Sequence, residues 1–166
     1  RERAEFGGAR AARPAPGPDG ADDAAFTLAP NPGEGAKPLA AIASGGELSR
    51  VMLALKAVLA GVDRVETLVF DEIDAGIGGR VAEVAGRKLA AIGKERQVIC
   101  ITHLPQIAAR AARHLVIRKV AGRDETHVEA EPVAGPARVE ELARMLAGEA
   151  VTPTARQHAA ALLKAG

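Results

Sequence analysis

Residues 67–79 read TLVFDEIDAGIGG, an apolar run that ends abruptly in acidic side chains. Thr67–Phe70 has the length and composition of a buried β-strand. Asp71 and Glu72 follow it directly, and Asp74 comes shortly after them. Open α/β sheets bind ligands at the carboxyl ends of their parallel strands, so this stretch predicts a polar site at a sheet edge.

Adjacent carboxylates can divide the work of a hydrolysis. One can hold a Mg²⁺ ion, directly or through its water shell, while the other takes a proton from an attacking water molecule. Asp residues are also common as caps and turn residues where a strand leads into a helix. Taken alone, the acidic run therefore leaves a purely structural role open for Asp71 or Asp74.

Residues 42–60, IASGGELSRVMLALKAVLA, predict an amphipathic helix that begins close to two glycines. Its apolar residues recur at helical spacing, at Leu48, Val51, Met52, Leu55 and Val58. Ser44 and Glu47 fit a capping box, which does not explain Gly45 and Gly46. Each glycine costs about 1 kcal/mol relative to alanine inside a helix. Bare backbone N–H groups at a helix N-terminus, helped by the helix dipole, attract phosphate.

A second apolar run, Gln97–Thr102, predicts another buried strand, and His103 follows it. A single histidine in such a place is more often structural than catalytic. Cys100 lies inside the run and fits a small core residue better than a reactive thiol. The remaining histidines have no comparable placement, and no His, Cys or acidic residues show the spacing of a zinc site.

Strand and helix signals alternate along the rest of the chain. Helices are predicted over 81–92, 104–112, 139–146 and 153–164, with strands over 114–120 and 127–132. The apolar spacing places five residues on one face of the first of these helices: Val81, Val84, Ala85, Leu89 and Ile92. This alternation predicts an α/β fold with a mostly parallel sheet flanked by helices. Residues 7–24, rich in Gly, Pro and Ala, are expected to form a flexible loop or surface insertion, with short extended pieces near 4–6 and 25–28.

Composition limits the classes of function. The 166 residues carry a net charge of +1, so no overall basic field favours nucleic acid or a membrane surface. Only 2% of the residues are aromatic, so the core must be built from aliphatic side chains. No apolar stretch approaches the roughly 18 residues that span a bilayer, and no signal peptide opens the sequence. With one cysteine, these features favour a cytoplasmic location and no membrane partner.

Taken in order, the glycine helix, the acidic strand end and the histidine strand end resemble the C-terminal part of an ATP-binding-cassette ATPase head of the SMC-like type. SGGE at 44–47 is similar to the signature motif and LVFDE at 68–72 to the Walker B strand. DAGI at 74–77 resembles the D-loop, and His103 resembles the switch histidine.

Two longer stretches are similar to a bacterial DNA-repair branch of this family. They are DEIDAGIGGR at 71–80 and THLPQIA at 102–108. The resemblance covers roughly Ala25 to Gly166 and leaves the Gly/Pro-rich stretch outside. It implies ATP hydrolysis with Mg²⁺ in recombinational repair of DNA double-strand breaks, with DNA as a partner of the whole protein and a location at the nucleoid.

In this family two heads enclose two ATP molecules. The resemblance implies that Ser44 and Gly46 contact the γ-phosphate of ATP held by the second head. It further implies that Gly45 permits the close approach and that Glu47 lies in the turn whose dipole faces the phosphate.

The resemblance assigns the remaining site residues within one head. Asp71 is expected to hold Mg²⁺, through water, while Glu72 polarises the attacking water. His103 is expected to touch the γ-phosphate, and Asp74 to couple the two sites as part of the D-loop.

The sequence departs from the family in lacking a G-x-x-x-x-G-K-[ST] loop and a long heptad stretch. Residues 1–166 are therefore expected to form the C-terminal half-head alone, without the Walker A lobe and the coiled coil. The expected partners are the N-terminal half-head of the same protein and a second head in an ATP-dependent dimer. The isolated chain is expected to be inactive.

Three alternatives remain. A chromosome-organising SMC head is the nearest, but the AGIGG continuation of the D-loop favours the repair branch. DEID also resembles the acidic box of a helicase, although the next strand ends in ITH and not in Ser-Ala-Thr. A DNA-binding scaffold would need a basic stripe, and the near-neutral charge does not indicate one.

Overall fold

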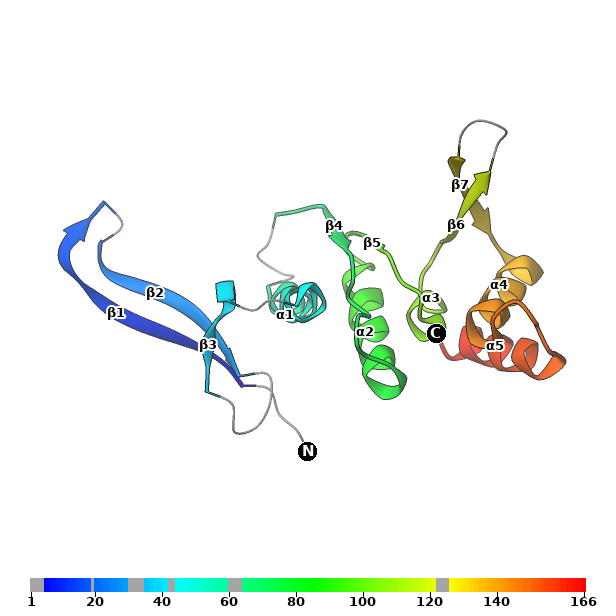
Figure 1. The fold of residues 1–166 in the computed structure, drawn as a ribbon, viewed down its shortest axis with the longest axis horizontal. Helices are drawn as coiled ribbons and strands as arrows, with labels where there is room; N and C mark the ends of the chain where they lie inside the picture. The colour runs from blue at the N-terminus through cyan, green and yellow to red at the C-terminus, as the bar shows by residue number, and fades with distance from the viewer. Residues whose placement is uncertain (1–4, 19, 30–34, 42–43, 60–63, 122–125) are drawn as a thin grey trace. The chain divides into compact units, whose positions relative to one another are not determined.

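The computed structural model describes residues 5–18, 20–29, 35–41, 44–59, 64–121 and 126–166. The chain divides into two compact units, Arg1–Leu48 and Ser49–Gly166. Each unit has its own strands, which Figure 1 shows along the chain.

The first unit is built on a long antiparallel hairpin, visible in Figure 1 as the blue strands. Strand β1 (Glu5–Gly17) pairs with β2 (Gly20–Ala29), and the short β3 (Lys37–Pro38) pairs with β2. A short 3-10 helix η1 (Leu39–Ala41) follows.

The expectation of a loop over residues 7–24 is wrong, because most of them lie in this hairpin. The sequence of β2 shows no alternation of apolar and polar residues, because the strand is exposed along most of its length and becomes buried only at Leu28 and Ala29. Backbone pairing and an Arg10–Asp22 ion pair at 2.8 Å connect the strands instead. Of the extended pieces expected near 4–6 and 25–28, residues 5–6 belong to β1 and residues 25–28 to β2, while residue 4 lies outside the described residues.

Two parallel strands lie at the centre of the second unit. Strands β4 (Thr67–Phe70) and β5 (Gln97–Cys100) pair in parallel, with Thr67 opposite Gln97 and Phe70 opposite Cys100. Helix α2 (Gly79–Ile92) forms the crossover between them. Helix α1 (Gly45–Val58) supplies Leu53 to the same core. The core residues are Leu53, Leu68, Phe70, Ile73, Ala82, Ala85, Leu89, Ile92 and Ile107.

Helix α2 buries smaller side chains than its apolar spacing predicts. Val81 and Val84 are exposed, whereas Ala82, Ala85 and Gly86 are buried. The short helix α3 (Pro105–Ala108) crosses so close to Gly86 that a Cβ there would lie 3.1 Å from the carbonyl oxygen of Gln106. Small residues on α2 therefore permit a close helix contact.

The rest of the unit is a second hairpin and a helix pair. Strands β6 (His114–Ala121) and β7 (Thr126–Val133) are antiparallel. Helices α4 (Gly135–Ala147) and α5 (Pro153–Ala165) share a small core with α3, formed by Ala108, Ala109, Leu142, Ala143, Ala155 and Ala159. Thr152 caps α5, since its hydroxyl accepts the Ala155 N–H at 3.1 Å.

The α/β fold class with helices flanking a parallel sheet is confirmed, although the parallel pairing in the described residues is that of β4 with β5. No helix in the described ranges combines the length and apolarity needed to cross a bilayer.

Candidate active site at the ends of the parallel strands

The polar residues that end the two predicted strands come together at one sheet edge. Phe70 and Cys100 are opposite each other as the last residues of β4 and β5. The pairing continues by one bond, from the Ile101 N–H to the Phe70 carbonyl oxygen at 3.0 Å. The segments 71–74 and 102–103 both follow this point, so they lie at the same edge of the sheet.

Glu72 has an unusual backbone for a residue with a side chain. Its φ is 55°, the only positive value of a non-glycine residue in the described part of the chain. That left-handed conformation costs about 1–2 kcal/mol for a residue with a Cβ. The Glu72 N–H donates to Asp71 Oδ1 at 2.8 Å, and both side chains are exposed. Glycine would adopt this conformation at a lower backbone cost.

Asp74 differs from its acidic neighbours because it is buried, at 4% exposure. Its Oδ2 accepts hydrogen bonds from Thr102 Oγ1 at 2.6 Å and from the His103 backbone N–H at 2.8 Å. The His103 ring nitrogen Nδ1 also lies 2.9 Å from Oδ2. Burial alone would raise the pKa of Asp74, but these hydrogen bonds and the His103 charge bring that pKa below its ordinary value.

The turn that carries the acids is attached to α1 through backbone carbonyl groups. The Ser49 hydroxyl donates to the Asp71 carbonyl oxygen at 2.7 Å. Arg50 Nη1 donates to the Ala75 carbonyl oxygen at 2.9 Å. Neither role could be predicted from the sequence, because a polar residue in a helix gives no sign of a backbone partner more than twenty positions away.

The signature-like residues form the start of α1, and this first part of the helix, up to Leu48, belongs to the first unit. Ser44 Oγ accepts the Glu47 N–H at 3.4 Å, so half of the predicted capping box is present. Ser44 and Gly45 are exposed, whereas Gly46 is buried. The backbone at this helix start is thus partly accessible, as contact with a phosphate would need.

Comparison with known proteins gives a consistent identification. No protein-family model matches the chain. The DNA repair protein RecN of Treponema pallidum is 53% identical over 150 residues, which cover 90% of this chain and 26% of that protein. RecN of Streptomyces coelicolor is 49% identical over 163 residues, which cover 98% of this chain and 28% of that protein. This is a RecN-like chain. It spans about a quarter of the length of these relatives.

The long match to the Streptomyces protein corrects the expected extent of the resemblance, because 98% coverage includes most of the β1–β2 hairpin. The match to the Streptomyces protein therefore extends into the hairpin of the RecN-like chain.

Solved structures agree on the fold. The Smc head domain of Pyrococcus yayanosii, solved with a coiled coil and joint, matches with a TM-score of 0.58 at 20% identity over 82% of this chain and 25% of that chain. A structure from work on ATP-driven dimerization and DNA-stimulated activation of SMC ATPases matches with a TM-score of 0.52 at 20% identity, over 76% of this chain and 75% of that chain. The RecN-like chain thus has the fold of an SMC-type ATPase head.

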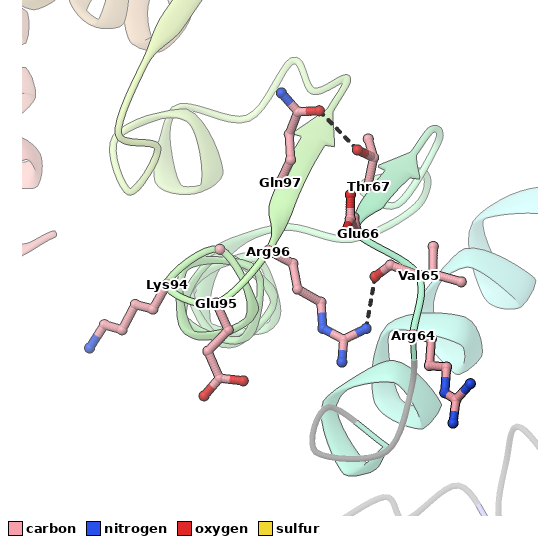
Figure 2. A pocket seen from close by; sticks show the side chains of 9 residues that line it. Arg64, Val65, Glu66, Thr67, Lys94, Glu95, Arg96 and Gln97 are labelled. Carbon is pink, nitrogen blue, oxygen red and sulfur yellow. Dashed lines mark hydrogen bonds between the residues drawn. The ribbon is translucent and has the colours of Figure 1, made fainter.

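Two other features of the RecN-like chain lie outside the cluster of acids and histidine. Burial, with smaller contributions from Asp74 and Asp71, raises the pKa of the Cys100 thiol to about 11, so it is not a nucleophile at neutral pH. Figure 2 shows an open polar hollow at the amino ends of β4 and β5, where Arg96 donates to the Val65 carbonyl oxygen at 2.8 Å. Because the strands are parallel, this hollow and the acids lie at opposite sheet edges.

A divalent cation would have few protein ligands at this edge. The described residues contain no group of three or more His, Cys, Asp or Glu side chains placed to bind a metal. Mg²⁺ in nucleotide sites is typically held by one or two carboxylates, with phosphate oxygens and water completing its shell. Asp71, exposed and with one oxygen engaged by the Glu72 N–H, fits that limited role.

Proposed function

We propose that this RecN-like chain is part of an ATP-hydrolysing head that acts in recombinational repair of DNA double-strand breaks. The observation that carries the proposal is the exposed Glu72 carboxylate on a strained turn, at the sheet edge that also presents His103. The named function of the sequence relatives, DNA repair, and the SMC-type head fold both support it.

Each residue at the edge has a role in the proposed hydrolysis. Glu72 accepts a proton from a water molecule as the water oxygen attacks the γ-phosphorus of ATP. The bond to the β–γ bridging oxygen breaks, and ADP and phosphate leave. His103 contacts the γ-phosphate through its exposed ring. Asp71 would hold Mg²⁺ through water, and that ion would supply charge neutralisation at the phosphates.

The signature-like residues are proposed to act on a second head. Ser44 and Gly46 would contact the γ-phosphate of the ATP bound there, with Gly45 allowing close approach. Glu47 lies in the first helical turn, whose dipole favours an anion. The D-loop role of Asp74 between two sites stays a prediction, and its carboxylate contacts Thr102 and His103 of its own chain.

A half-head needs a partner that covers its open sheet face. Leu68 and Phe70 are buried on one face of the parallel pair, whereas Val69, Ile99 and Ile101 on the other are 63%, 47% and 56% exposed. We propose that the Walker A half-head of the same protein covers this face. This chain spans only about a quarter of the length of its relatives, which supports the proposal of a second half-head in the same protein. Alone, the chain would not hydrolyse ATP, because no phosphate-cradling loop is present in its sequence.

The cellular setting follows from the repair role. We propose a cytoplasmic protein that works at the nucleoid, with DNA as a partner of the complete protein. A chromosome-organising SMC head would share this fold. Sequence identity of about half to repair proteins, against 20% to the matched SMC heads, favours repair.

The test is Glu72→Gln in the full-length protein. ATP turnover should fall by about 10²–10⁴-fold while ATP binding is kept, because a glutamine cannot take the proton. ATP-bound head dimers should accumulate and be visible by light scattering. Glu83→Gln, on the exposed side of α2, is the matched control and should keep turnover within about twofold. Unchanged turnover in Glu72→Gln would show that the general base lies elsewhere.

A further inference from the structure

The buried carboxylate of Asp74 gathers three donors from the end of the neighbouring strand. Thr102 Oγ1, the His103 backbone N–H and His103 Nδ1 all lie within 2.9 Å of the same oxygen, Oδ2. We propose that Asp74 is a positioning residue that holds the His103 imidazole in one orientation and one tautomer, with Nδ1 protonated and Nε2 presented to the nucleotide. This inference rests on the proposed function.

The chemistry of the contacts decides the tautomer. An ionised carboxylate only accepts hydrogen bonds, so the ring nitrogen that contacts it must carry the proton. The low pKa of Asp74 keeps it ionised at neutral pH. With Nδ1 occupied as a donor, Nε2 is the ring nitrogen left to meet a ligand. The His103 side chain is 72% exposed, against 6% for that of Asp74, so the ring projects outward from a buried anchor.

Hydrogen bonds that involve the segments after both strands hold the Asp74 carboxylate in place. Thr102 donates to Asp74, and its hydroxyl oxygen accepts the Leu104 N–H at 3.0 Å. Asp74 follows β4 and Thr102 follows β5, so their hydrogen bond joins the segments after the two strands, across 28 residues of sequence. A side chain fixed in this way loses little further freedom when it binds a ligand, which is the advantage of a preorganised group.

This role differs from the one that the D-loop resemblance implies. A residue that couples two heads must reach the second head, whereas the Asp74 carboxylate is buried against its own chain. Its effect on hydrolysis should therefore pass through His103 and vanish when His103 is removed.

The first measurement needs no variant of Asp74. Full-length protein labelled with ¹³C and ¹⁵N at histidine is studied by NMR, and the His103 signals are assigned by their loss in His103→Gln. The ring carbon shifts of a neutral imidazole distinguish the Nδ1–H from the Nε2–H form. We expect His103 in the Nδ1–H form. A wild-type His103 in the Nε2–H form, or in a mixture like that of free histidine, would overturn the proposal.

The second measurement is a double-mutant cycle in the full-length protein. Asp74→Asn should lower ATP turnover by about tenfold or more, as loss of a partner that orients a histidine commonly does. In the His103→Gln background the same change should cost less than about twofold. Losses that multiply would show that Asp74 acts independently of His103 and would overturn the proposal. Thermal unfolding of each variant identifies any that fails to fold, and the wild-type spectrum then decides the question.

The two measurements separate this inference from the proposed function. If the wild-type protein hydrolyses no ATP, or His103→Gln leaves turnover unchanged, the proposed role of His103 in hydrolysis fails. If turnover depends on His103 but the tautomer or the cycle disagrees, the role of Asp74 fails and the proposed function stands.

Discussion

Arg50 on α1 donates a hydrogen bond to the carbonyl oxygen of Ala75, in the turn that carries the acidic residues, with a distance of 2.9 Å from Nη1. The same nitrogen lies 3.5 Å from the carbonyl oxygen of Ile73, which is fully buried. The turn is thus stabilised by the burial of Ile73 and by the hydrogen bonds of the Arg50 guanidinium. Both carbonyl groups closely follow Glu72, whose backbone is strained.

The Arg50 contact predicts a local loss of stability on substitution. Arg50→Ala in the full-length protein should lower the free energy of local opening of residues 71–77 by about 1 kcal/mol, since it removes a hydrogen bond from a charged donor. Hydrogen exchange of these amides measures the change. Arg87→Ala removes an exposed guanidinium 3.9 Å from Glu83 and should leave them unaffected. Equal protection in both variants would show that Arg50 does not support the turn.

The contact between α2 and α3 predicts that Gly86 resists replacement. At an unobstructed position in a helix, a Gly→Ala change such as Gly86→Ala would raise the free energy of unfolding by about 1 kcal/mol. Here the new Cβ would lie 3.1 Å from the Gln106 carbonyl oxygen and 3.3 Å from Ile107 Cα, so overpacking should cost about 1–3 kcal/mol. Hydrogen exchange across α2 and α3 should show weaker protection. Ala91→Gly, at an exposed position of α2, is the control and measures the effect of helix propensity alone. Stronger protection in Gly86→Ala than in the wild type would exclude the close approach of α3 to Gly86.

Cys100 should be slow to alkylate in the folded protein. Its pKa of about 11 leaves almost no thiolate at pH 8, and raising the pH should increase the rate about tenfold per unit until the pKa is reached. Mass spectrometry of the Cys100 peptide after timed exposure to iodoacetamide measures the rate. The same peptide in denatured protein is the control and should react at the ordinary rate of cysteine. Similar rates in the two states would show that the thiol is neither buried nor perturbed.

The sequence was informative where residue type and order determine position. Apolar runs that stop at Asp71 and at His103 predict two strand ends, and parallel pairing places such ends at one edge. The hairpin over residues 5–29 could not be foreseen, because mostly exposed strands show no apolar period. The exposure of Val81 and Val84 was likewise hidden, since spacing fixes a helix face but not what covers it.

Contacts between residues far apart in the sequence could not be predicted from sequence patterns. The bond from Thr102 to Asp74 depends on the register of β4 with β5, which no local signal sets. The positive φ of Glu72 falls on a residue type that gives no sign of it, because glycine or asparagine is the usual occupant of that conformation. The chemistry of these residues could be predicted, but their partners could not.

The central claim is that two heads share each ATP, with Ser44 of one head contacting the nucleotide of the other. The motivation is a helix start with two glycines that local stability disfavours, together with the SMC-type head fold. The most direct measurement mixes two full-length proteins of different mass. The first keeps its Walker A lysine and carries Ser44→Arg, while the second lacks that lysine and carries a photoreactive residue at position 44.

In the mixture ATP can be held only by the first protein, and a crosslink can form only at position 44 of the second. Size-exclusion chromatography first confirms that mixed dimers form. The account predicts radiolabelled ATP on the second protein, dependent on the presence of the first and lost when the first carries a disabled Walker A lysine as well. Labelling of the second protein in the absence of the first, or no labelling although mixed dimers form, would contradict it.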